Sequence, residues 1–169
     1  MKKVYFTLLF LGLLITSAAQ NIDISVTGYA NFNNSDYSIT EAGEDFSSAM
    51  ITESSAYISV DYLSLMDKIF GSDIKWRVFV NKSDISWNQN LSLEIKRSGN
   101  GTKASWLGPS PTINHGTSYQ TVTNIPVYFF RGRYGITDIP LGFRLSGASL
   151  RMGANQFETT ITFTVYDDW

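Results

Sequence analysis

The chain has 169 residues, a formal net charge of −2 at pH 7 and no cysteine. A mildly acidic chain lacks the basic stripe that nucleic-acid binding needs, so we exclude nucleic acid as a partner. The lack of cysteine excludes disulfides and thiolate zinc sites, so the fold must depend on an apolar core and backbone hydrogen bonds.

The first twenty residues show the three parts of a secretory signal peptide. Lys2 and Lys3 form a basic start, an apolar stretch covers 4–15, and small residues lead up to Ala19. This apolar stretch is shorter than the roughly 20 residues of a membrane-spanning helix. We therefore expect cleavage after Ala19, export through the secretory pathway, and one mature domain of about 150 residues over 20–169.

Alternating apolar residues predict two strands in the first third of the mature chain. They cover 22–26 and 56–63. The stretch 31–55 between them is rich in turn-forming residues and is predicted to be a loop. A short strand within it, around 37–39 or around 49–52, stays open.

The next segments alternate between helix and strand signals. Ser64 and Asp67 have capping-box spacing, which predicts one or two helical turns. Two sharp strand patterns follow at 73–84 and 91–97, and Trp76 in the first shares the apolar face, so we assign it to the core. Polar, turn-rich residues separate these two strands and favour a hairpin with a long loop.

The second half contains a long connection and then four strand patterns. Glycine and proline punctuate 98–116, which predicts an irregular connection. Pro126 and Pro140 are expected at strand beginnings, where a missing amide donor is tolerated. The last two strands are expected to pair through a turn around 152–155. The four predicted strands are 119–123, 127–131, 139–146 and 157–165.

Together these patterns predict an all-β fold. About seven to nine short strands, with turn signals roughly every ten residues, are typical of an antiparallel, immunoglobulin-like β-sandwich. The terminal strand is predicted to point its apolar residues into the core, while its outer edge is available to pair with a neighbour. These residues of the assembly strand are Phe157, Ile161, Phe163 and Val165.

No residue pattern indicates catalysis. His115 is the single histidine and there is no cysteine, so a Ser/His/Asp or Cys/His catalytic site would have to be built around this one residue, and no pattern near it indicates such a site. The carboxylates show no spacing that indicates the paired acids of a glycosidase. We predict a non-enzymatic protein without catalytic residues.

One acidic loop and three aromatic residues are the candidate ligand sites. Glu41, Glu44 and Asp45 surround a glycine, which is a weak indication of a calcium loop, and no other cofactor is expected. Trp87, Trp106 and Tyr119 fall in predicted loops or strand ends. There they form either an aromatic platform for a sugar ring or partner protein, or caps on the open ends of the sandwich.

Two segments near the end of the chain carry a family resemblance. IPLGFRLSG at 139–147 and TTITFTV at 159–165, in an exported cysteine-free sandwich, resemble bacterial pilin-like β-sandwich proteins, including the spore-coat-U type. The resemblance covers about the last third of the chain. It implies a structural or adhesive protein of the cell surface or periplasm, a pilin-like subunit that assembles through strand edges with itself or with other surface proteins.

Two alternatives stay open from the sequence. The loop aromatics also suit a carbohydrate-binding module that recognises polysaccharide. The mature length, the alternation and the aromatic Trp169 permit a small eight-stranded outer-membrane β-barrel.

Overall fold

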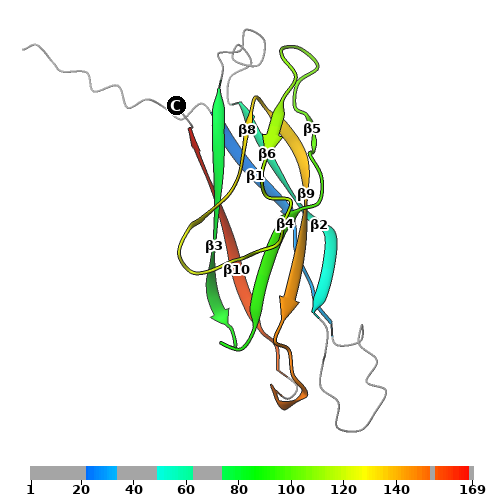
Figure 1. The fold of residues 1–169 in the computed structure, drawn as a ribbon, viewed down its shortest axis with the longest axis vertical. Coiled ribbons are helices and arrows are strands. Elements are labelled where there is room, and N and C mark those ends of the chain that lie inside the picture. Colours follow the sequence, from blue (N-terminus) through cyan, green and yellow to red (C-terminus); the bar gives the residue numbers. More distant parts are fainter. Residues whose placement is uncertain (1–21, 34–48, 63–73, 153–154, 168–169) are drawn as a thin grey trace, which may run out of the picture.

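The computed structural model describes residues 22–33, 49–62, 74–152 and 155–167. Strands dominate this part of the chain (Figure 1). They are β1 (Ile22–Gly28), β2 (Met50–Tyr62), β3 (Lys75–Ser86), β4 (Ser92–Arg97), β5 (Thr102–Lys103), β6 (Thr112–Asn114), β7 (Gln120–Thr121), β8 (Val127–Arg133), β9 (Ile136–Ser146) and β10 (Glu158–Asp167).

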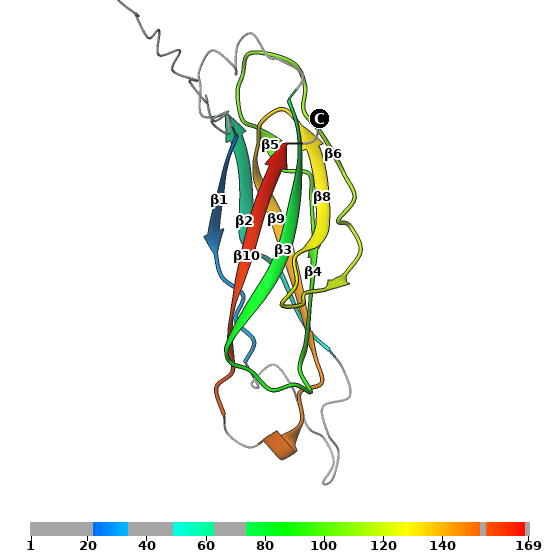
Figure 2. The ribbon, with the colours of Figure 1, turned by 90° about the vertical axis from the view of Figure 1, so that its left-hand side faces the viewer.

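The strands form two antiparallel sheets that face each other across a shared core (Figures 1 and 2). Sheet A has the order β1-β2-β9-β4-β7, and β5 also pairs with β9. Sheet B has the order β10-β3-β8-β6. The prediction of an all-β antiparallel sandwich is confirmed. Within the described residues the strand number is ten, because the connection at 98–116 also contains the short strands β5 and β6, while β7 falls in the strand predicted at 119–123.

β2 is longer than the sequence pattern indicates. It begins at Met50 and runs to Tyr62, so the strand left open around 49–52 is present and is continuous with the one predicted from Ala56. The register with β9 shifts between Glu53 and Ala56, and Ser54 has φ 55°. This bulge breaks the period of two, which explains why the sequence reads as a loop there.

Two predicted strand pairs are wrong. β3 and β4 lie in different sheets, so they form no hairpin, and β10 pairs with β3 instead of β9. The connection from β9 to β10, which includes the 3-10 helix η2 (Leu150–Met152), crosses from sheet A to sheet B. Alternation specifies which face of a strand is buried, but strands with one buried face can lie side by side or opposite each other.

Pro140 lies inside β9, and the expectation that it begins a strand is wrong. On one side of β9, Leu141 pairs with Arg97 of β4, whereas Thr137 pairs with Thr102 of β5. Pro140 falls between these two partners, where the missing amide donor interrupts no ladder on that side. Its carbonyl accepts a hydrogen bond of 2.8 Å from the Ser98 amide.

Trp76 lies in the core, as predicted. Its side chain is 1% exposed, packs edge-on against Phe130 at 5.9 Å, and donates from Nε1 to the Tyr134 carbonyl at 2.8 Å. Phe129 and Phe130 are both buried although they are adjacent. A register shift between β3 and β8 at this point turns both rings inward.

Besides the calcium loop, three structural predictions lie outside the described residues. They are the signal peptide, the helical turns after Ser64 and the short strand around 37–39. Within the described residues, none of the helices combines the length and the apolar character that crossing a membrane requires.

Candidate functional site: the pocket and free edge beside β10

The outer strands β1 and β10 lie next to each other, each at the end of its own sheet (Figure 2). β1 closes the gap between the sheets over part of its length only. Ile22 is buried at 5% exposure, whereas Val26 is 47% exposed. Beyond Val26 the two sheets are therefore not sealed on this side.

A pocket of about 690 Å³ occupies this unsealed part of the sandwich. Its floor consists of buried residues from sheet A, including Leu93, Phe143 and Leu145. Ile161 and Phe163 from β10 line the opposite side and are only partly buried. The pocket thus lies between the apolar faces of the sheets, where a fully closed sandwich would have core.

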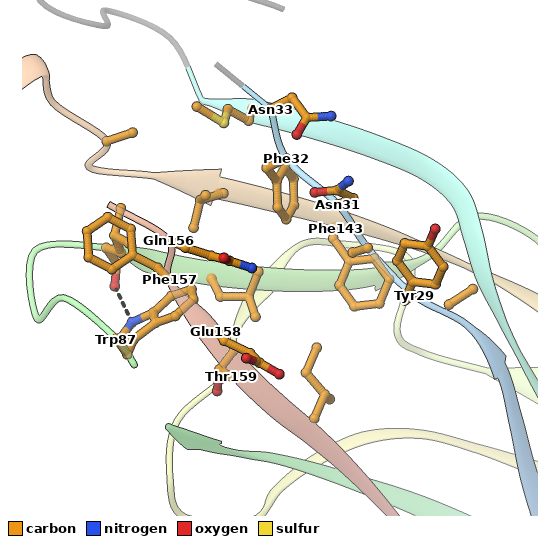
Figure 3. A pocket seen from close by; sticks show the side chains of 18 of the residues that line it. Tyr29, Asn31, Phe32, Asn33, Trp87, Phe143, Gln156, Phe157, Glu158 and Thr159 are labelled. Atoms are coloured by element: carbon orange, nitrogen blue, oxygen red, sulfur yellow. Dashed lines mark hydrogen bonds between the residues drawn. The ribbon is translucent and has the colours of Figure 1, made fainter. Parts of the chain in front are cut away.

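Trp87 and Phe157 lie together on one side of the pocket (Figure 3). The indole of Trp87 is fixed by a hydrogen bond of 3.2 Å from Nε1 to the Leu91 carbonyl. Lys82 Nζ lies 4.8 Å from the centroid of the indole ring. This ammonium is also held by both carboxylate oxygens of Asp84, at 2.5 and 2.7 Å.

Polar side chains gather at the rim. Asn31 and Asn33 come from the segment after β1, Gln156 lies just before β10, and Glu158 is the first residue of β10 (Figure 3). All four are exposed. Among the described lining residues there is no lysine, arginine or histidine, and Glu158 is the one carboxylate.

A polar cluster lies on the outer face of sheet A, away from the pocket. Glu53 accepts hydrogen bonds from Tyr119 at 2.9 Å and from Ser98 at 2.6 Å, and its Oε1 is 2.8 Å from Lys96 Nζ. Partial burial alone would raise the pKa of Glu53, but these three bonds outweigh it and lower the pKa. Partial burial, followed by the bond to Glu53, raises the pKa of Tyr119.

Arg144 and Glu94 complete this cluster. Arg144 donates two hydrogen bonds to Glu94, at 2.5 and 2.8 Å, and these lower the pKa of Glu94. The guanidinium also lies 4.5 Å from the Tyr119 ring centroid. The Glu53 carboxylate lies over Gly142, and a Cβ there would come 2.5 Å from one of its oxygens, so the carboxylate would have to move.

The three predicted platform aromatics lie in separate places. Trp87 faces the pocket, Tyr119 belongs to the cluster on sheet A, and Trp106 is 88% exposed in the β5–β6 loop. That loop and the β3–β4 connection, which carries Trp87, lie at opposite ends of the sandwich (Figures 1 and 2). The structure therefore brings none of the three together into one surface.

The other predicted site residues divide into two groups. Glu41, Glu44 and Asp45 of the calcium loop lie outside the described residues, and the described part of the chain contains no cluster of three metal-ligating side chains. His115 is exposed, and its Nδ1 is 2.8 Å from the Tyr128 hydroxyl.

The assembly strand lies at an edge. β10 ends sheet B, and its described partner strand is β3 on one side. The apolar residues of β10 face inward as predicted, but only Val165 is fully buried. Ile161, Phe163 and Phe157 stay partly exposed because they line the pocket.

Sequence reasoning did not find the pocket. Its floor residues read as ordinary core, because alternation cannot show whether the facing strand covers them. Tyr29 and Phe32, two aromatics in a polar, turn-rich stretch, were the available signal, and both line the pocket.

Comparison with known proteins gives no relative: no family model matches the sequence, and no curated protein or solved structure matches it significantly.

Proposed function

We propose that this chain is an exported structural protein of the bacterial cell envelope, without enzymatic activity, whose copies associate through the outer edge of β10. The observation that carries the proposal is the position of β10. It is a strand of ten residues at the end of sheet B. Along 158–164, no other described strand pairs with its second edge.

The composition of β10 supports association. Natural edge strands are commonly guarded by lysine, proline or inward-pointing charges, because an open edge recruits further strands. β10 contains no lysine, arginine or proline. Pairing of this edge with the same edge of a second copy would give a two-fold arrangement, the commonest symmetry of homo-oligomers.

Light scattering after size-exclusion chromatography tests this proposal. The mature chain is expected to show a molar mass that rises with concentration towards the dimer. The double variant Thr160→Lys/Thr162→Lys adds two charges to exposed positions of β10 and is expected to stay monomeric.

The matched control is Thr117→Lys/Ser118→Lys, which adds the same charge to exposed residues outside the strands. It is expected to associate like the unmodified chain. A mature chain that is monomeric at every concentration, or equal weakening by both double variants, would refute association through β10.

A further inference from the structure

The pocket beside β10 has the size of a small-molecule site. Its volume of about 690 Å³ falls within the range of roughly 300–1,000 Å³ that is typical of ligand pockets. It opens between the sheets, so a ligand would contact the inner apolar faces of both. The pocket borders the free edge of β10, and Ile161 and Phe163 of β10 line it, so its ligand is tested by binding measurements and not by the oligomeric state.

The floor of the pocket favours an apolar ligand. Leu93, Phe143 and Leu145 are at most 9% exposed, and Ile161 and Phe163 face them from β10. These side chains offer no hydrogen-bond donors or acceptors. A sugar ring placed there would leave its hydroxyl groups unpaired, which is costly in a buried site. A hydrocarbon chain has no such cost.

The rim of the pocket favours a ligand whose head group is polar but uncharged. The amide side chains of Asn31, Asn33 and Gln156 provide both donors and acceptors at the mouth of the pocket. No described lining residue is cationic, so an anionic head would meet no counter-charge and would instead face the carboxylate of Glu158. Lys82, behind Trp87, is already bound to Asp84.

We infer that the pocket binds a single-chain neutral lipid, with the hydrocarbon chain between the sheets and an uncharged hydroxyl- or amide-bearing head at the asparagine-rich rim. Trp87 and Phe157 then flank the ligand where it enters. The specificity rests on two properties of the described residues, which are an apolar floor and a rim without cations.

The test uses the neutral fluorescent probe N-phenyl-1-naphthylamine with the mature chain. Bound probe is expected to be excited by energy transfer from tryptophan, because Trp87 lines the pocket. Both competitors are used below their critical micelle concentrations. The neutral 1-monodecanoylglycerol is expected to displace the probe at a concentration at least tenfold lower than the anionic decanoate needs. Maltose is expected to displace none.

Two variants assign binding to this pocket. Ala148→Phe fills part of the pocket and is expected to weaken probe binding at least tenfold, whereas Ile125→Phe, at an exposed site outside the lining, is expected to leave it unchanged. Asn33→Lys supplies the missing cation and is expected to improve displacement by decanoate about tenfold. Thr117→Lys, outside the pocket, is its control.

Three outcomes would overturn the inference. They are absence of probe binding, equal displacement by the neutral and anionic decanoyl compounds, and displacement by maltose. Asn33→Lys changes an exposed side chain, so it keeps the inference refutable even if Ala148→Phe does not fold. Loss of self-association in the β10 variants leaves all these expectations unchanged.

Discussion

Arg97 is a buried cation whose partners in the described part of the chain are neutral oxygens. It is 6% exposed and lies on the same, buried face of β4 as Leu93 and Ile95. Its guanidinium donates to the carbonyls of His115 and Gly99 and to Asn100 Oδ1. Burial lowers the pKa of Arg97. The side chain thus ties two parts of the connection after β4 to the end of that strand.

Replacement of Arg97 by alanine is expected to lower the free energy of unfolding by roughly 2–4 kcal/mol, because three partly buried hydrogen bonds lose their charged donor. Urea denaturation measures the change. Arg131→Ala, at an exposed position of β8, is the control and is expected to change it by less than about 0.5 kcal/mol. Equal losses in both variants would show that Arg97 is not a specific anchor.

The cluster around Glu53 makes the free energy of unfolding depend on pH in the acidic range. In the folded chain the pKa of the Glu53 carboxyl lies below the ordinary value of 4.5. As the pH falls, this carboxyl therefore takes up a proton in the unfolded chain before it does so in the folded chain. The stabilisation is therefore present above about pH 4.5 and is lost as the pH falls through the folded-state pKa. Glu94, bound to Arg144, acts in the same direction.

Glu53→Gln is accordingly expected to reduce the loss of stability between pH 5 and pH 3. Urea midpoints measured across this range give the slope. Glu158→Gln, at an exposed carboxylate outside the cluster, is expected to keep the slope of the unmodified chain. An unchanged slope for Glu53→Gln would contradict the proposed role of the cluster.

At the scale of the elements, Trp76 of β3 packs closely against Gly132 of the neighbouring strand β8. The indole lies over Gly132 of β8, and a Cβ added there would overlap its six-membered ring. It would also come within 2.8 Å of the Thr112 carbonyl in β6. A side chain at this position therefore has no free space between the strands of sheet B.

Gly132→Ala is expected to destabilise the chain by roughly 1–3 kcal/mol through overpacking. Trp76→Phe removes the overlapping ring, so the double variant is expected to lose less stability than the sum of the two single variants. Thermal or urea unfolding of all four proteins measures the coupling. Additive losses would show that the close approach of Trp76 to Gly132 does not limit this position.

At the scale of the whole molecule, β10 contributes both to the core and to an edge. Val165 is buried, and Ile161 and Phe163 pack against the main core. Deletion of 159–169 would remove one of the two partner strands of β3 and uncover its edge at Val78 and Val80. The deleted chain is expected to be unfolded by circular dichroism, and a folded monomer would show that β10 is dispensable for folding.

The sequence predicted the layers of this molecule but not their connections. Alternation located β3, β4 and β10 because each buries one face over most of its length. The partner strands were not predictable, since a buried face matches any other. The pocket was missed for a related reason: whether Phe143 is covered depends on where β1 stops.

The change of partner at Pro140 has a consequence for local opening. On one side, β9 pairs with β4 from Leu141 onwards and with β5 at Thr137, and between the two ladders the Ser98 amide donates to the Pro140 carbonyl. Fraying of the short β5 end, next to the loop with Trp106, can therefore stop before it reaches β4. Pro140 has no amide donor and lies between the two ladders, so opening at the β5 end is expected to extend less far towards the pocket end of the sandwich.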